Sequence, residues 1–119
     1  MKALDLVGHI VTYSEQVKCP ATNMRLQALL YRIQQEYLKR YGRPAFDDKT
    51  EFAGEIVYFP AVYYEYACYA WRWYIINVPK NPYVEESLNE CIKDVVQLFT
   101  DVPTWKMIEA IVKEKNGIS

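Results

Sequence analysis

The chain has 119 residues, of which 51% are hydrophobic and 24% are charged, and its formal net charge is −1 at pH 7. This length and composition are typical of one globular domain that buries its own core, and they exclude a disordered or fibrous protein. The near-zero net charge excludes a global field that would draw the protein onto nucleic acid or an anionic membrane.

Hydrophobic residues recur at helical spacing in four segments, which predicts four amphipathic helices. The expected inward positions are Leu6 or Val7, Ile10 and Tyr13 or Ser14 in residues 4–17; Leu26, Leu29, Leu30, Ile33, Tyr37 and Tyr41 in residues 23–41; Val84, Leu88, Cys91 or Ile92, Val95 and Phe99 in residues 84–99; and Trp105, Ile108, Ile111 and Val112 in residues 103–117. Gly42, followed by Arg43 and Pro44, is a typical end for the second of these helices.

Residues 44–60 have a different pattern. Asp47 and Asp48 indicate a turn, and residues 52–59 are rich in side chains that tolerate an extended backbone. We therefore expect a mostly α fold, a single compact domain over residues 1–119 with about five helices and at most a short β-hairpin near residues 44–60.

The fifth expected helix covers residues 61–76, AVYYEYACYAWRWYII, which follow Pro60. In one continuous helix, aromatic and aliphatic side chains would cover about two thirds of the circumference, leaving Glu65 and Arg72 as the polar strip. Such a helix is either central in the core or presents part of its aromatic surface to a partner. The second alternative predicts a partner-binding set of Tyr63, Tyr64, Trp71, Arg72 and Trp73.

A possible basic stripe lies on the helix expected at residues 23–41. Arg25, Arg32 and Lys39 are seven residues apart, so they share one side of this helix. They could follow a phosphate backbone or meet an acidic partner. The alternative is a solvated face in which Glu36, four residues from both Arg32 and Arg40, neutralises the middle.

No pattern in the sequence points to catalysis, a metal or a cofactor. The single histidine, His9, has no nominated partner, and Cys19, Cys68 and Cys91 form no CxxC pair. Neighbouring carboxylates such as those of Glu85 and Glu86 are explained by the dipole of a helix N-terminus. Unpaired cysteines and an N-terminal segment unlike a signal peptide favour a cytoplasmic protein. We expect no enzymatic activity.

Residues 26–48 read LQALLYRIQQEYLKRYGRPAFDD, and residues 58–60 read YFP. This order of residues resembles the Panacea domain, also called the SocA-like or GepA-like domain of phage-associated proteins. The matching positions are Leu26, Gln27, Leu29, Leu30, Tyr31, Tyr37, Leu38, Tyr41, Gly42, Pro44, Phe46, Asp47, Tyr58 and Pro60. The departures are Ala28 for a lysine, Glu36 for a tryptophan, Phe59 for a glycine, and IVKEKNGIS in place of a C-terminal Thr-His element.

The resemblance implies a protein-binding module of mobile-element or prophage origin. Members of the family act as antitoxins that bind toxins, or as an adaptor that delivers a toxin to a host ClpXP-type protease, and neither role needs a catalytic residue. Two alternatives stay open: a phage-encoded inhibitor of a host defence nuclease, such as an anti-CRISPR protein, and a nucleic-acid binder using Arg25, Arg32, Lys39, Arg40 and Arg43. The sequence does not decide whether the chain forms a homodimer.

The stripe in residues 23–41 gives a stability prediction. Leu30→Ala should lower the free energy of unfolding by about 2–5 kcal/mol, because it removes buried methyl groups and leaves a cavity. Denaturant unfolding of the two proteins measures the difference. A change below about 1 kcal/mol would show that Leu30 lies outside the core.

Overall fold

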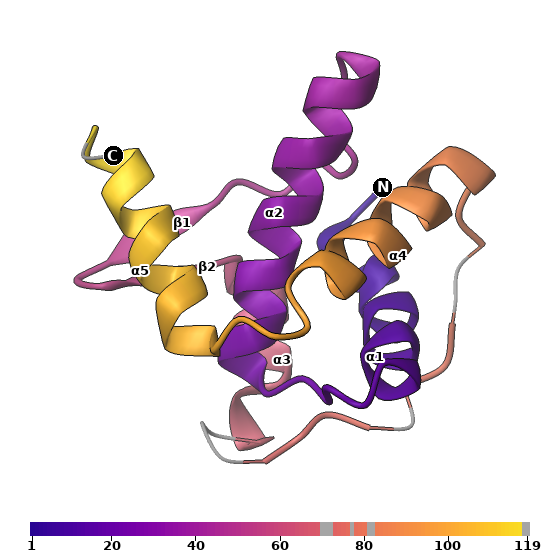
Figure 1. The fold of residues 1–119 in the computed structure, drawn as a ribbon, viewed down its shortest axis with the longest axis horizontal. Helices are drawn as coiled ribbons and strands as arrows, with labels where there is room; N and C mark the ends of the chain where they lie inside the picture. The colour runs from indigo at the N-terminus through magenta and orange to yellow at the C-terminus, as the bar shows by residue number, and fades with distance from the viewer. Residues whose placement is uncertain (70–72, 77, 81–82, 118–119) are drawn as a thin grey trace.

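Helix α2 (Asn23–Tyr41) runs through the middle of the molecule, with the hairpin and α5 on one side and α1 and α4 on the other (Figure 1). The computed structural model describes residues 1–69, 73–76, 78–80 and 83–117. Along this part of the chain the elements are η1 (Ala3–Leu6), α1 (Val7–Gln16), α2, β1 (Glu51–Ala53), β2 (Ile56–Tyr58), α3 (Pro60–Glu65), η2 (Ala67–Tyr69), α4 (Glu86–Leu98) and α5 (Thr104–Lys115), where η marks a 3₁₀ helix. The expected mostly α fold with five α-helices and one hairpin is confirmed.

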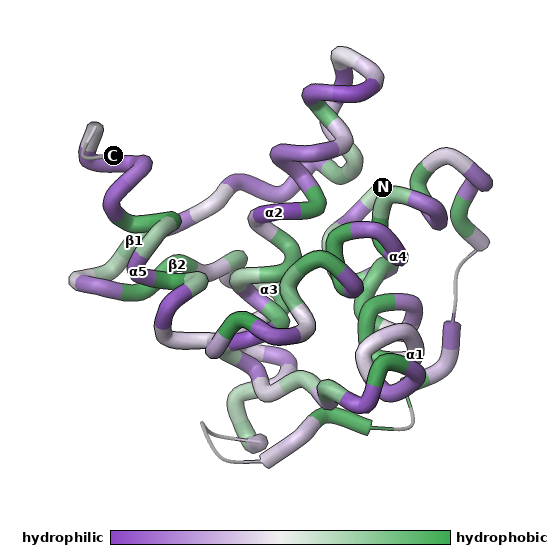
Figure 2. Tube along the Cα trace, in the orientation of Figure 1, coloured by the Kyte–Doolittle hydropathy of each residue, from purple (hydrophilic) through white to green (hydrophobic). Residues whose placement is uncertain are grey.

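Both ends of α2 are capped, and the C-terminal cap is at Gly42, as the sequence predicts. The Thr22 side chain caps the N-terminus by accepting a hydrogen bond from the Arg25 backbone N–H at 3.2 Å. Gly42 ends the helix with φ +71°, a left-handed conformation that glycine adopts without the steric cost of a Cβ. Of the expected stripe, Leu26, Leu29, Leu30 and Ile33 are fully buried and Tyr37 is 2% exposed, whereas the expectation of an inward Tyr41 is wrong, since Tyr41 is 41% exposed. Figure 2 shows hydrophobic residues recurring along α1, α2 and α4, while the end of α2 that projects from the molecule is largely hydrophilic.

The side of helix α5 (Thr104–Lys115) that faces the core differs from the side expected from the sequence. Ile108 and Ile111 are buried as expected, but Trp105 is 65% exposed and Met107 takes an inward position. Because successive helical residues are rotated by about 100°, Trp105 and Met107 lie on opposite sides of the helix. The expectation of an inward Trp105 is therefore wrong.

The long aromatic helix expected at residues 61–76 is also absent from the described part of the chain. Helix α3 ends at Glu65, the short η2 follows, and residues 73–76 are not helical. A continuous helix would leave much of its aromatic surface in water. Breaking it instead allows Val62 of α3 and Ile75 of the later segment to enter the core from separate elements. The aromatic and β-branched residues at 73–76 also have low helix propensity.

A chain of side-chain hydrogen bonds joins α2 to α3 and to its N-cap residue, Phe59, which directly follows the hairpin. The Phe59 backbone N–H donates to Gln27 Oε1 at 2.8 Å, and Gln27 Nε2 donates to Asn23 Oδ1 at 2.9 Å. Asn23 Nδ2 in turn donates to the Tyr63 carbonyl at 3.0 Å. Gln27 and Asn23 are buried, so these bonds satisfy polar groups that water does not reach. They also set the position of α3 relative to α2.

Helix α1 approaches the segment at residues 78–80 very closely at Gly8. A Cβ added at Gly8 would lie 1.9 Å from the Pro79 carbonyl oxygen and 3.1 Å from Lys80 Cα. These are backbone atoms, which cannot move aside as the end of a flexible side chain can. The contact therefore requires a glycine at this position of α1.

Gly8→Ala tests this contact through the sign of its effect. In an unobstructed helix interior this change stabilises by about 0.5–1 kcal/mol. Here we expect the free energy of unfolding to fall by about 1–3 kcal/mol, because the added methyl group displaces residues 78–80. Denaturant melts measure the difference, and a gain in stability would show that this segment is not held against α1.

Candidate functional site

The first part of the candidate site is a stretch outside any helix or strand that we call the aromatic segment, residues 73–76. Ile75 is fully buried, and its backbone N–H donates to the Ala21 carbonyl at 2.8 Å. Its neighbours face outward: Trp73, Tyr74 and Ile76 are 65%, 55% and 49% exposed. The segment is thus held to the core by one buried residue, Ile75, while its three other large side chains lie in solvent.

A group of tyrosines, the tyrosine stack, forms the second part. It consists of Tyr58 at the end of β2 and Tyr63 and Tyr64 in α3. The ring centroids of Tyr58 and Tyr63 are 5.3 Å apart, those of Tyr63 and Tyr64 are 5.3 Å apart, and the stack leaves Tyr64 66% exposed. The ring contacts restrict these side chains, so covering them would cost little conformational entropy.

These two features include part of the predicted partner-binding set and add to it. Tyr64 and Trp73 are exposed, and Tyr63 is half-buried against the core. Trp71 and Arg72 lie outside the described residues. Sequence reasoning missed Tyr74 and Ile76, because it treated residues 61–76 as one continuous helix, whereas residues 73–76 are not helical.

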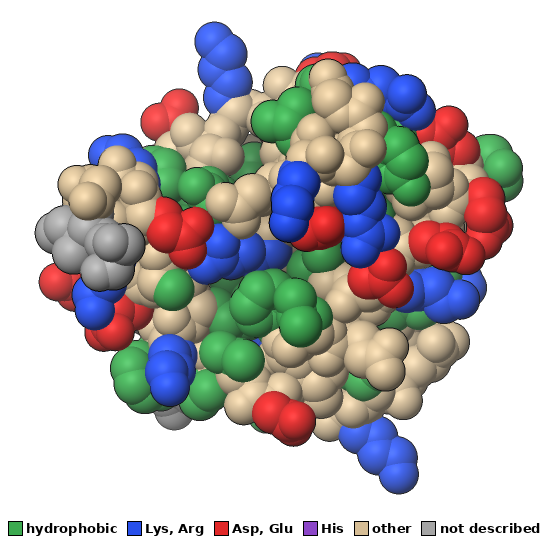
Figure 3. All heavy atoms as spheres, turned by 45° about the horizontal axis from the view of Figure 1, so that its top comes forward, with side chains coloured by type: hydrophobic (Ala, Val, Ile, Leu, Met, Phe, Trp, Pro, Cys, Tyr) green, Lys and Arg blue, Asp and Glu red, His purple; other side chains and the backbone are tan. Residues whose placement is uncertain are grey.

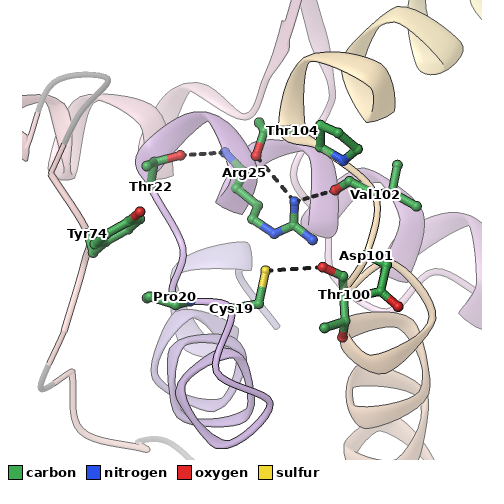
Figure 4. Close-up of a pocket in the computed structure, with 10 residues that line it drawn as sticks. Cys19, Pro20, Thr22, Arg25, Tyr74, Thr100, Asp101, Val102 and Thr104 are labelled. Carbon is green, nitrogen blue, oxygen red and sulfur yellow. Dashed lines mark hydrogen bonds between the residues drawn. The ribbon is translucent and has the colours of Figure 1, made fainter.

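Arg25 does not belong to a surface stripe. It is only 6% exposed, and its side chain crosses from α2 to the connection between α4 and α5 (Figure 4). Its Nη1 donates to the Val102 carbonyl at 2.9 Å and to Thr104 Oγ1 at 3.3 Å, and its Nη2 donates to the Phe99 carbonyl. Phe99 is the C-cap of α4, so the guanidinium meets the negative end of that helix dipole. Arg25 is a structural link.

A pocket of about 390 Å³ lies beside this link, between the start of α2 and the connection from α4 to α5. Cys19 Sγ points toward the Thr100 carbonyl at 3.5 Å, and Tyr74 stands on the opposite wall (Figure 4). The polar groups facing the pocket are thus largely bonded within the chain. This leaves the pocket without a set of free groups directed at a ligand.

The other two residues of the expected stripe behave differently from each other. Arg32 pairs with Glu114 of α5 through two hydrogen bonds, at 2.9 and 2.7 Å. These bonds lower the pKa of the Glu114 carboxyl below its ordinary value. Glu36 pairs with Arg40 at 2.9 Å, so of its two expected partners it takes Arg40. Lys39 is exposed.

The basic side of α2 is therefore not a continuous positive surface. Arg25 is buried and Arg32 is neutralised, which leaves Lys39 as the exposed cation of the three. Lys and Arg side chains lie among Asp and Glu side chains on the face drawn in Figure 3. This mixture of charges does not favour a nucleic-acid backbone, which needs a field of one sign.

The described residues offer no constellation for metal chemistry. Within residues 1–69, 73–76, 78–80 and 83–117, His, Cys, Asp and Glu side chains form no group of three or more that could hold a metal ion. Burial raises the pKa of the Cys91 thiol to about 11, so this group stays protonated and unreactive at neutral pH. Among the same residues no helix is long and apolar enough to cross a membrane.

Comparison with models of known protein families, with curated proteins and with solved structures finds no match to this chain. The resemblance to the Panacea domain stays a prediction from the residues themselves.

Arg25 and Lys39, the two ends of the expected basic stripe, should differ in how much their substitution changes the free energy of unfolding. Arg25→Met should lower the free energy of unfolding by roughly 2–3 kcal/mol, because it keeps the aliphatic stem but leaves the Phe99 and Val102 carbonyls without their donor. Lys39→Met, the matched control on the exposed side, should change it by less than about 0.5 kcal/mol. Equal effects in denaturant melts would contradict the structural role of Arg25.

Proposed function

We propose that this protein is a protein-binding module whose partner contacts the aromatic segment and Tyr64. The observation that carries the proposal is the exposure of Trp73, Tyr74 and Ile76 beside a buried anchor, Ile75. Binding hot spots, the few interface residues that supply most of the affinity, are rich in tryptophan and tyrosine, and both residue types are exposed here.

The distribution of charge supports a protein partner over a nucleic acid. The guanidinium groups of Arg25 and Arg32 are engaged within the chain, so they are not free to neutralise phosphates. The aromatic segment itself contains no charged residue. Its contribution to binding would come from apolar burial and from the hydroxyl and indole hydrogen bonds of its aromatic side chains.

Within this class we propose an antitoxin or a proteolytic adaptor that binds a toxin protein in the cytoplasm. The support is the resemblance of residues 26–48 to the Panacea domain and a surface suited to occlude another protein. The alternative is an inhibitor of a host defence nuclease, such as an anti-CRISPR protein. Both work by covering a partner surface, so the identity of the partner distinguishes them.

The test is affinity capture of the full chain from its native host, followed by mass spectrometry and by binding measurements with the purified partner. Tyr64→Ala and Trp73→Ala should each weaken binding by roughly 2 kcal/mol or more. Trp71→Ala and Arg72→Ala test two further members of the predicted set. Leu98→Ala is the matched control, because Leu98 is 72% exposed on α4, outside both the aromatic segment and α3.

Circular dichroism of each variant checks that the helices are retained. A captured toxin or protease supports the antitoxin or adaptor role, and a captured defence nuclease supports the alternative. If Tyr64→Ala and Trp73→Ala bind the partner as tightly as the Leu98→Ala control does, the partner surface lies elsewhere.

A further inference from the structure

A second surface, which we call the α5 groove, lies between α5 and the hairpin. Its volume is about 540 Å³, and it shares no lining residue with the aromatic segment or the tyrosine stack. The apolar part of its lining comes from three elements: Met24 of α2, Ile56 of β2, and Trp105, Ile108 and Val112 of α5. Trp105 is 65% exposed, so most of its indole surface is in water.

The groove follows the axis of α5. Trp105, Ile108 and Val112 are spaced i, i+3 and i+7, so they form one stripe along the helix over about 10 Å. Met24 and Ile56 complete the apolar lining from α2 and the hairpin. An apolar channel of two helical turns, bounded by a helix and a second element, has the shape that accepts the apolar face of another helix.

The charged side chains of the groove define what such a helix would carry. Glu55 lines it from the hairpin, and Glu109 and Lys113 line it from α5. Lys113 and Glu109 pair at 3.4 Å with both side chains more than half exposed, and such a pair contributes little and exchanges readily. Glu55 has no ion pair among the described residues. The groove thus has a carboxylate on each of two sides and an excess negative charge.

We infer that the α5 groove binds a partner protein through an amphipathic helix whose apolar face is flanked by lysine or arginine. The apolar face covers Trp105, Ile108 and Val112, and the flanking cations meet Glu55 and Glu109. This surface goes beyond the proposed function, because it is a separate site with its own recognition chemistry. A symmetric dimer through the groove would place two surfaces of the same net negative charge against each other, so its charges would be less complementary than those of a basic helix.

The experiment uses the full chain and a synthetic peptide of about fifteen residues, with leucines at helical i, i+3, i+4 and i+7 spacing and lysines on both flanks. A second peptide replaces the lysines with glutamates. Nuclear magnetic resonance follows the Trp105 indole N–H during titration. The basic peptide should shift this resonance and bind at least about tenfold more tightly than the acidic one.

Variants separate this groove from the rest of the molecule. Trp105→Ala should weaken binding of the basic peptide by about tenfold or more. The double variant Glu55→Lys with Glu109→Lys should reverse the preference, so that the acidic peptide binds more tightly. Leu98→Ala is the control for an exposed apolar residue outside the groove. Tyr64→Ala with Trp73→Ala should leave peptide binding unchanged, so failure of the proposed function would not remove this result.

Three outcomes would overturn the inference. The first is that neither peptide shifts the Trp105 resonance at millimolar concentration, and the second is that the two peptides bind equally. The third is a homodimer of the chain alone, detected by sedimentation and lost in Trp105→Ala, which would assign the groove to a second copy.

Discussion

The burial of the first half of α2 on every side organises the rest of the molecule. Residues 23–30 are all buried, including the polar Asn23, Arg25 and Gln27. Buried polar groups are costly unless they are hydrogen-bonded, so each of these side chains has to find an acceptor or donor in a neighbouring element. Gln27 bonds Phe59, the N-cap of α3. Asn23 bonds Tyr63 within α3, and Arg25 bonds the connection between α4 and α5. The layers around α2 are therefore placed by directional bonds as well as by apolar packing.

Most of the fold could be predicted from periodicity, because the apolar stripes of α2 and α4 are decided locally. Leu26, Leu30, Leu88 and Ile92 are buried where their spacing indicates. Trp105 shows the limit of this reasoning. The apolar residues of α5 cover more than one side of the helix, and only packing against the other elements decides which side faces inward.

The candidate site was less predictable than the fold. Composition identified residues 61–76 as unusual, and Tyr64 and Trp73 from that stretch are exposed. Its conformation depends on contacts from distant parts of the chain, such as the bond between the Ile75 amide and the Ala21 carbonyl. The surface position expected for Arg25 was wrong for the same reason. A cation in the first turn of a helix normally lies in solvent, and here the distant α4–α5 connection buries it.

The three polar side chains inside α2 also bear on how the molecule opens. Peeling away α3 with its N-cap Phe59, or the α4–α5 connection, would strand a buried polar group, so these elements should open together with α2 in one cooperative unit. The aromatic segment is attached differently: by the buried Ile75 side chain, by the hydrogen bond from the Ile75 N–H to the Ala21 carbonyl, and by that from the Trp73 N–H to the Tyr69 carbonyl. The hydrogen bonds of Asn23, Gln27 and Arg25 described above do not involve this segment. Amide hydrogen exchange would then be slow in α2 and faster at Ile75, which leaves the aromatic segment free to adjust its shape while the scaffold stays intact.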